Sequence, residues 1–178
     1  MPILPLVGFL LLLAFIFFVS KFKAPLKIYS RFGACEATHK LLSTDLGNAT
    51  ARIKLSRHGI NGIPDAVFEE LVEKVILVGE FKSRKYRDRV RLNELYQLML
   101  YMGHLKDRYP NHTILGCLAY ADGKVKIAYD HDLYLGLVGL RDEYWQTIKR
   151  RIPPNMPPLH KRMKVSGANP GLRLASKM

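Results

Sequence analysis

The chain has 178 residues, with 28 Lys and Arg against 15 Asp and Glu, and a formal net charge of +13. Apolar residues make up 48% of it, which excludes a wholly disordered protein and predicts one packed core of moderate size. Two cysteines, Cys35 and Cys117, are too few for a disulfide framework, a four-cysteine zinc site or a four-cysteine iron–sulfur cluster. Any metal ion is therefore expected to be held by oxygen or nitrogen.

The first segment is apolar. Residues 3–19 carry no charge and are just long enough to cross the hydrocarbon core of a bilayer as a helix, so we predict a transmembrane anchor over residues 1–20. Lys21, Lys23 and Lys27 follow it, and the positive-inside rule then places the rest of the chain in the cytoplasm, at the inner or plasma membrane. A cleaved signal peptide and a secreted protein are the alternative, although no basic residue precedes the apolar run.

The other elements are predicted from hydrophobic periodicity and turn residues. We expect a helix over 28–43, strands over 51–55, 65–71 and 75–79, a helix over 92–109, a hairpin with strands 113–120 and 124–129, and a helix over 132–150. This order predicts an α/β domain within residues 21–150. Prolines at 153, 154, 157 and 158 predict a tail, 151–178, without regular structure.

Positive charge is concentrated at the C-terminal end. From residue 149 onward the sequence contains Lys and Arg but no Asp or Glu. A field of this sign favours phosphate-rich partners, either nucleic acid or an anionic membrane surface. A tail that only improves solubility is the alternative.

Two polar side chains follow the apolar strand at 75–79. Glu80 and Lys82 flank Phe81, and they emerge on one face because strand side chains alternate with a period of two. A carboxylate and an ammonium group therefore share one side of the sheet. A surface ion pair is the structural alternative for so short a motif.

Asp65 precedes them in the chain, after the turn sequence Gly62-Ile63-Pro64. If the strand that it opens pairs with the strand of Glu80 as a hairpin, the two carboxylates face each other. They repel unless a cation lies between them, and a hard divalent ion such as Mg²⁺ suits a few oxygen ligands and retained water. A turn-capping role for Asp65 is the alternative.

A third pair lies on the helix predicted at 92–109. Gln97 and Tyr101 are four residues apart, so the amide and the phenol lie next to each other on one helix face. Both can point at the carboxylates if this helix crosses the strand ends. The alternatives are a core tyrosine and a solvated glutamine.

In this order and spacing, Gly62-x-Pro64-Asp65, Glu80-x-Lys82 and Gln97-x-x-x-Tyr101 resemble the PD-(D/E)XK nuclease superfamily, specifically its RecB-type branch, which includes CRISPR-associated exonucleases. The resemblance spans about residues 30–130 and implies a restriction-endonuclease-like αβββαβ core. It also implies metal-dependent hydrolysis of DNA phosphodiester bonds. Several relatives bind an iron–sulfur cluster, and none is expected here because the cysteines are missing.

Five residues are then candidates for catalysis. Asp65 and Glu80 would hold Mg²⁺ or Mn²⁺, Lys82 would orient the attacking water and offset developing charge, and Gln97 and Tyr101 would hold a phosphate or the Lys82 ammonium. The expected function is a membrane-anchored DNA nuclease. The alternative is a membrane-tethered nucleic-acid-binding module of the same fold, without catalysis.

Many relatives with the Gln-x-x-x-Tyr element have a further His or Glu ligand on the first helix. Glu36 and His39 are both available in the helix predicted at 28–43, and His39 is the predicted metal ligand. A histidine on the helix surface is the alternative.

A basic loop follows the strand of Glu80 and Lys82. Its candidates for DNA binding are Arg84, Lys85, Tyr86, Arg87, Arg89 and Arg91. The cations would receive the DNA backbone, and Tyr86 would stack on an unpaired base. An ordinary solvated loop is the alternative.

Overall fold

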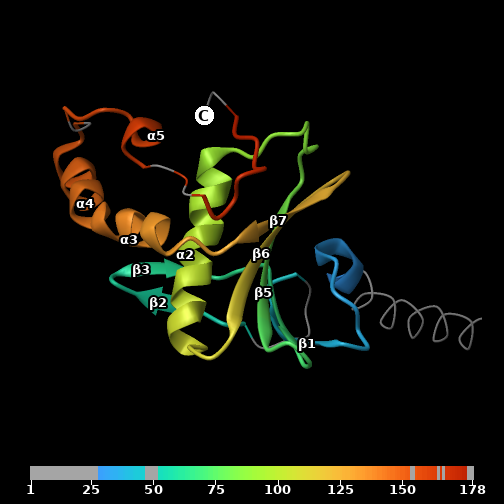
Figure 1. Ribbon diagram of the computed structural model, residues 1–178. Coiled ribbons are helices and arrows are strands. Elements are labelled where there is room, and N and C mark those ends of the chain that lie inside the picture. Colours follow the sequence, from blue (N-terminus) through green and yellow to red (C-terminus); the bar gives the residue numbers. More distant parts are fainter. Residues whose placement is uncertain (1–27, 47–51, 153–154, 164, 166, 176–178) are drawn as a thin grey trace, which may run out of the picture.

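The computed structural model describes residues 28–46, 52–152, 155–163, 165 and 167–175. A five-stranded mixed sheet forms the centre of this mixed α/β fold, in the order β1-β4-β5-β6-β7 (Figure 1). Its strands are β1 (His39–Thr44), β4 (Ala66–Glu70), β5 (Val75–Lys82), β6 (Thr113–Tyr120) and β7 (Lys124–Ala128). The helices are α2 (Leu92–Arg108), α3 (His131–Gly139), α4 (Arg141–Arg150) and α5 (Leu159–Arg162), and β2 (Leu55–Arg57) pairs with β3 (Ile60–Gly62) as a separate hairpin.

The connections explain the mixed sheet. Short turns join β4 to β5 and β6 to β7, and both pairs are antiparallel. β5 and β6 are parallel, and parallel neighbours require a crossover, which α2 provides. The crossover helix α2 lies over one face of the sheet, where it contacts β5 and β6 (Figure 1).

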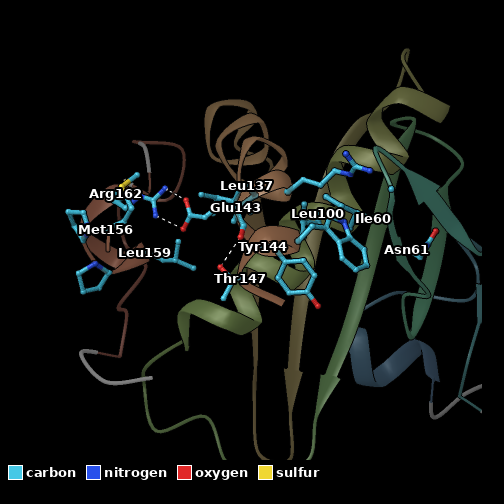
Figure 2. A pocket seen from close by; sticks show the side chains of 16 residues that line it. Ile60, Asn61, Leu100, Leu137, Glu143, Tyr144, Thr147, Met156, Leu159 and Arg162 are labelled. Atoms are coloured by element: carbon cyan, nitrogen blue, oxygen red, sulfur yellow. Dashed lines mark hydrogen bonds and ion pairs between the residues drawn. The ribbon is translucent and has the colours of Figure 1, made fainter. Parts of the chain in front are cut away.

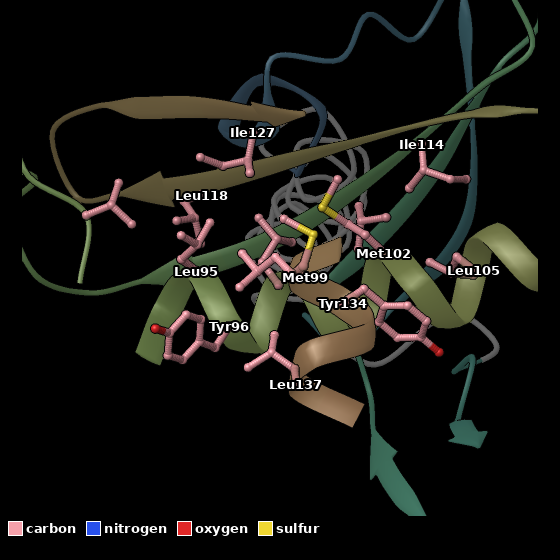
Figure 3. Close-up of a cluster of buried hydrophobic side chains, with 14 of the residues drawn as sticks. Leu95, Tyr96, Met99, Met102, Leu105, Ile114, Leu118, Ile127, Tyr134 and Leu137 are labelled. Atoms are coloured by element: carbon pink, nitrogen blue, oxygen red, sulfur yellow. The ribbon is translucent and has the colours of Figure 1, made fainter. Parts of the chain in front are cut away.

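Apolar side chains are buried on both faces of the sheet. On the α2 face, Leu95, Met99 and Met102 meet Leu118 of β6 and Tyr134 of α3 (Figure 3). On the opposite face, Phe32, Phe68 and Leu77 belong to a smaller cluster. Burial of each such side chain contributes about 1.5–3 kcal/mol, so α2 is held firmly against the strands.

The predicted helix at 92–109 is confirmed. It begins after Arg91, carries Glu94 in its first turn and Lys106 and Arg108 in its last, and is capped at Tyr109, directly before Pro110. Acidic residues at the start of a helix and basic ones at its end complement the helix dipole. Proline disfavours helical geometry at the residue before it, which fixes the C-terminal boundary.

The helix predicted at 28–43 is wrong in its second half. Helical structure ends at residue 32, and Gly33 has φ +70°, a conformation in which glycine commonly terminates a helix. The chain then forms β1, in which Leu41 contacts the Phe32 cluster and Leu42 contacts the α2 side. Adjacent side chains of a strand point to opposite faces of the sheet, which is why Leu41 and Leu42 belong to different clusters.

The strand predicted at 51–55 is largely absent. Residue 51 lies outside the described residues, and β2 begins only at Leu55 and pairs with β3 alone. The strands predicted at 65–71 and 75–79 correspond to β4 and β5. β5 is longer than predicted, so Glu80 and Lys82 lie within it.

The C-terminal part is more ordered than predicted. The helix predicted at 132–150 is divided between Gly139 and Arg141 into α3 and α4, and α5 follows the prolines. The tail then returns to the domain, where Asn169 Oδ1 accepts the amide hydrogen of Ala128 at 2.8 Å and Asn169 Nδ2 donates to the Ala128 carbonyl at 3.0 Å. Leu174 forms a bridge with Val90. The described part of the tail therefore belongs to the domain.

The predicted anchor, residues 1–20, lies outside the described residues. Within the described ranges, no helix has both the length and the apolar character needed to cross a membrane.

Candidate active site

Asp65, directly before β4, lies opposite Glu80, which is near the C-terminal end of β5. The antiparallel register pairs Ala66 with Gly79, so Asp65 lies at the level of Glu80, as predicted from the hairpin. Asp65 is fixed there because its Oδ2 accepts the backbone amide hydrogen of Phe81 at 2.6 Å. Thr44 also donates from Oγ1 to the Asp65 carbonyl at 2.8 Å, which ties this turn to β1.

Lys82 lies on the same face as Glu80. Its Nζ donates to Glu80 Oε1 at 3.0 Å and to Gln97 Oε1 at 2.9 Å. The Glu80 side chain is 7% exposed and the Lys82 side chain 21%, so this pair is much less screened than a surface ion pair. The arrangement places an ammonium group at the edge of a buried carboxylate.

Gln97 joins the helix to the strand. Its Nε2 donates to Glu80 Oε1 at 2.8 Å and to the Tyr101 hydroxyl at 3.0 Å, while its Oε1 accepts from Lys82. Both amide hydrogens are thereby used, and the amide orientation is determined by its partners. The structure thus places Gln97 and Tyr101 together on one face of α2 and brings Gln97 into contact with Glu80.

The two carboxyl groups are electrostatically strained. Burial raises the pKa of Asp65, and the Phe81 amide and Lys82 only partly offset it. Burial and the neighbouring Asp65 carboxylate raise the pKa of Glu80, against the lowering effect of Lys82. Two partly desolvated carboxylates side by side favour either a shared proton or a bound cation.

A divalent cation fits this donor set. Glu80 Oε2 is buried and makes no well-formed hydrogen bond to the described residues, although the Asp65 backbone amide approaches the carboxylate and lowers the pKa of Glu80. Such an orphaned acceptor is unfavourable unless a proton or a metal ion meets it. No group of three or more His, Cys, Asp and Glu side chains converges within the described ranges, and Asp65 and Glu80 by themselves would leave positions for water or substrate on an ion. That composition suits Mg²⁺ or Mn²⁺, since Mg²⁺ usually keeps several waters.

The structure does not bring His39 to this site, so it does not support the prediction that His39 is a metal ligand there. His39 begins β1 opposite Glu70, whereas Asp65 lies beside the other end of that strand, where Thr44 pairs with Ala66. The separation is about 15 Å along the strand. His39 Nδ1 lies 2.8 Å from Thr38 Oγ1 instead. Glu36 lies in the turn before β1 and not on a helix.

Two members of the predicted DNA-binding loop have structural contacts instead. Arg84 forms a bidentate pair with Glu94, with Nε to Oε1 at 2.7 Å and Nη2 to Oε2 at 2.6 Å. Tyr86 stacks on Tyr120 with ring centroids 5.1 Å apart, so one face of its ring is already covered. The exposed members are Lys85, Arg87, Arg89 and Arg91.

Glu94 is a residue that the sequence reasoning missed. It is buried, and besides Arg84 it accepts from the Tyr120 hydroxyl at 2.9 Å and from the Arg91 amide at 3.3 Å. It fastens the loop after Lys82 to the start of α2. The only feature of the sequence that could have drawn attention to Glu94 is its place in the first turn of a helix. That pattern predicts a helix-capping residue and does not predict burial.

No family model matches the chain, and no curated protein matches it. The crystal structure of SSO0001 is similar at a TM-score of 0.40 and 16% sequence identity. The match covers 80% of this chain and 63% of that one, so this chain spans less than two thirds of that protein's length.

Proposed function

We propose that the chain is a divalent-metal-dependent DNA nuclease of the PD-(D/E)XK type. The observation that carries the proposal is the pairing of half-buried Asp65 with buried Glu80, with an unpartnered oxygen on Glu80 and the Lys82 ammonium 3.0 Å from its other oxygen. The chain order also supports it: a helix at 28–32, then β1, β4, β5, α2 and β6, agrees with an αβββαβ core in which the β2–β3 hairpin is an insertion.

Asp65 and Glu80 would hold Mg²⁺ or Mn²⁺. The bound ion would polarise a phosphate oxygen and make water more acidic, as metal ions do in phosphodiester hydrolysis. Lys82, Gln97 and Tyr101 would supply the charge, the positioning and the hydrogen bonds that hydrolysis also requires.

Lys82 supplies positive charge beside the reacting phosphate. Its ammonium is held by both Glu80 and Gln97, so it is positioned before substrate arrives. A preorganised cation of this kind stabilises the extra negative charge that develops during hydrolysis. Gln97 is a positioning residue, since both its amide hydrogens are already used within the site.

Tyr101 offers a donor to the substrate. Its hydroxyl oxygen accepts from Gln97, which leaves its own hydrogen for a phosphate oxygen. A cavity of about 340 Å³ opens beside Gln97 and Tyr101, on the side of α2 that faces β3. The exposed Lys85, Arg87 and Arg89 would attract the DNA backbone to this region.

Residues 1–20 would anchor the enzyme in the inner or plasma membrane, with the catalytic domain in the cytoplasm. The support is the uncharged run at 3–19 and the lysines that follow it. DNA at the membrane would then be the substrate.

The test is digestion of end-labelled linear DNA and closed circular DNA by the full chain in detergent, with Mg²⁺, Mn²⁺ or EDTA. We expect cleavage only with metal, and a loss of at least a hundredfold in Asp65→Ala, Glu80→Ala and Lys82→Ala. Glu70→Ala and Lys126→Ala are matched controls, because these residues lie on the same sheet but outside the site. Cleavage in EDTA, or equal loss in the controls, contradicts the proposal. DNA binding without cleavage would favour the non-catalytic module.

A further inference from the structure

A second, larger hollow lies away from the carboxylates. It is a groove of about 740 Å³ between α4, α5 and the β2–β3 hairpin, and Figure 2 shows its labelled side chains on both walls. Leu100, Leu137, Tyr144, Met156 and Leu159 give it an apolar surface, and Trp145 lines it too. Its volume is typical of sites that hold an organic ligand.

The groove adjoins the small cavity that Gln97 and Tyr101 line. Ile60, Asn61 and Leu100 line both the groove and the smaller cavity beside Gln97 and Tyr101. Leu100 follows Gln97 by three residues on α2, a rise of about 4.5 Å along the helix axis. A chain molecule held in the groove would therefore extend towards Glu80.

Two aromatic rings of α4 remain accessible in this groove. Tyr144 is 58% exposed and Trp145 is 44% exposed, and their ring centroids lie 5.4 Å apart. Behind them, Arg162 of α5 forms a bidentate pair with Glu143 at 2.8 and 2.5 Å, which joins α5 to α4 (Figure 2). Exposed aromatic rings of this kind are suited to stacking against a flat ligand.

Positive charge lies beside the rings. The guanidinium of Arg141 lies against Gly59 at the groove, where a methyl group on the glycine would be 2.7 Å from Nε. Lys149, Arg150 and Arg151 are exposed at the other end of α4. Aromatic surface and cations together match the two parts of a single-stranded nucleic acid, its bases and its phosphates. A duplex conceals the faces of its bases and cannot stack in the same way.

We propose that this groove binds unpaired bases of single-stranded DNA, with Tyr144 and Trp145 as the stacking surface. Delivery of that strand to Asp65 and Glu80 rests on the proposed nuclease function, but binding does not. A lipid surface is the less favoured occupant, because α4 and the blue helical segment 28–32, which follows the predicted anchor in the sequence, lie on opposite sides of the sheet in Figure 1.

Trp145 is the only tryptophan, so its fluorescence reports on the groove directly. The full chain in detergent and EDTA would be titrated with single-stranded oligothymidylate and with a duplex of equal length. We expect quenching by the single strand at concentrations at least tenfold below those needed for the duplex. Stacking contributes about 1–3 kcal/mol per base, so Tyr144→Ala should weaken binding about fivefold to a hundredfold.

Ile148→Ala is the matched control, since Ile148 is 53% exposed on the same helix but does not line the groove. Absence of quenching, equal affinity for the duplex, or equal weakening by Ile148→Ala overturns the proposal. A blue shift of Trp145 emission in phosphatidylserine nanodiscs without DNA also overturns it, in favour of lipid. Cleavage without quenching counts against the groove alone, and quenching without cleavage counts against the nuclease alone.

Discussion

The ring of Tyr101 lies on the backbone of Gly62: a methyl group at Gly62 would come to 2.3 Å from Tyr101 Cε1. No side chain fits between them, so the turn before Asp65 and the helix that carries Gln97 are in direct contact. This contact helps to fix the Tyr101 hydroxyl 3.0 Å from Gln97 Nε2. The glycine of the first motif therefore shapes the site through packing.

Gly62→Ala should lower nuclease activity at least tenfold, because the methyl group displaces Tyr101 and with it Gln97. Overpacking of this kind also lowers the free energy of unfolding by about 1–3 kcal/mol. Cleavage rates and urea denaturation would measure the two effects. Gly139→Ala is the control, since a methyl group there meets nothing within 4 Å. Normal activity in Gly62→Ala would show that Tyr101 is not held through this contact.

Asp65→Asn should abolish activity yet stabilise the metal-free protein. The neutral amide removes the repulsion with Glu80, while its oxygen can still accept the Phe81 amide hydrogen. We expect a higher melting temperature for the variant in EDTA, as is common when a functional site is relieved of strain. Asp142→Asn, at a carboxylate that is 82% exposed, should leave the melting temperature unchanged.

The stabilisation by Asp65→Asn should depend on pH. Asp65 and Glu80 have pKa values raised above the ordinary 3.8 and 4.5, so the folded protein binds more protons than the unfolded chain between the ordinary and the raised values. The free energy of unfolding then falls as pH rises through that window. The advantage of the variant should be full at neutral pH and absent below pH 3.8, as denaturation at several pH values would show. A pH-independent advantage would place its origin elsewhere.

Divalent metal should raise the melting temperature of the wild type. A ligand that binds only the folded state stabilises it by about 2.7 kcal/mol at a concentration one hundred times its Kd. Mg²⁺ or Mn²⁺ should have this effect on the wild type and none on Glu80→Gln, measured by thermal scans with and without EDTA. Equal stabilisation of both proteins would mean that the ion binds at another site.

Glu94→Gln should weaken the fold and loosen the loop that follows Lys82. The Glu94 side chain is 5% exposed, and the change leaves Arg84 without its charged partner at a cost of about 3 kcal/mol. Burial alone would raise the pKa of Glu94, but Arg84, Tyr120 and the Arg91 amide lower it overall. Its contribution is therefore present at neutral pH and lost as pH falls through that lowered pKa.

Glu143→Gln is the matched comparison for Glu94→Gln. Glu143 also forms a bidentate pair with an arginine, but its side chain is 25% exposed, so solvent screens the pair and the loss should be much smaller than for Glu94→Gln. Denaturation of both variants at neutral pH would compare them. Equal losses would show that burial does not determine the strength of these pairs.

Local sequence patterns predict the part of the site that depends on short-range geometry. Period-two alternation places Glu80 with Lys82, the hairpin places Asp65 opposite Glu80, and helical spacing joins Gln97 to Tyr101. Each of these relationships spans one or two neighbouring elements. That is the range over which periodicity and turn chemistry determine structure.

Long-range relationships were not predictable in the same way. His39 was assigned to a helix because apolar spacing alone does not distinguish a short strand from a helix, and its true position depends on pairing with β4. Arg84 has the same charge as its exposed neighbours, and only its contact with Glu94 distinguishes it from them. The groove requires α4 and α5 to meet the β2–β3 hairpin, three elements that no local pattern connects.

Both outer strands of the sheet carry features that oppose edge-to-edge aggregation. β1 has an exposed lysine, Lys40, and an irregular register between Leu41 and Ser43, while β7 exposes Lys124 and Lys126. At the end of β7, Asn169 occupies both hydrogen-bonding groups of Ala128. Charged and capped borders of this kind discourage the addition of a further strand from another molecule. The sheet is thus built to end at β1 and β7, even at high local protein concentrations.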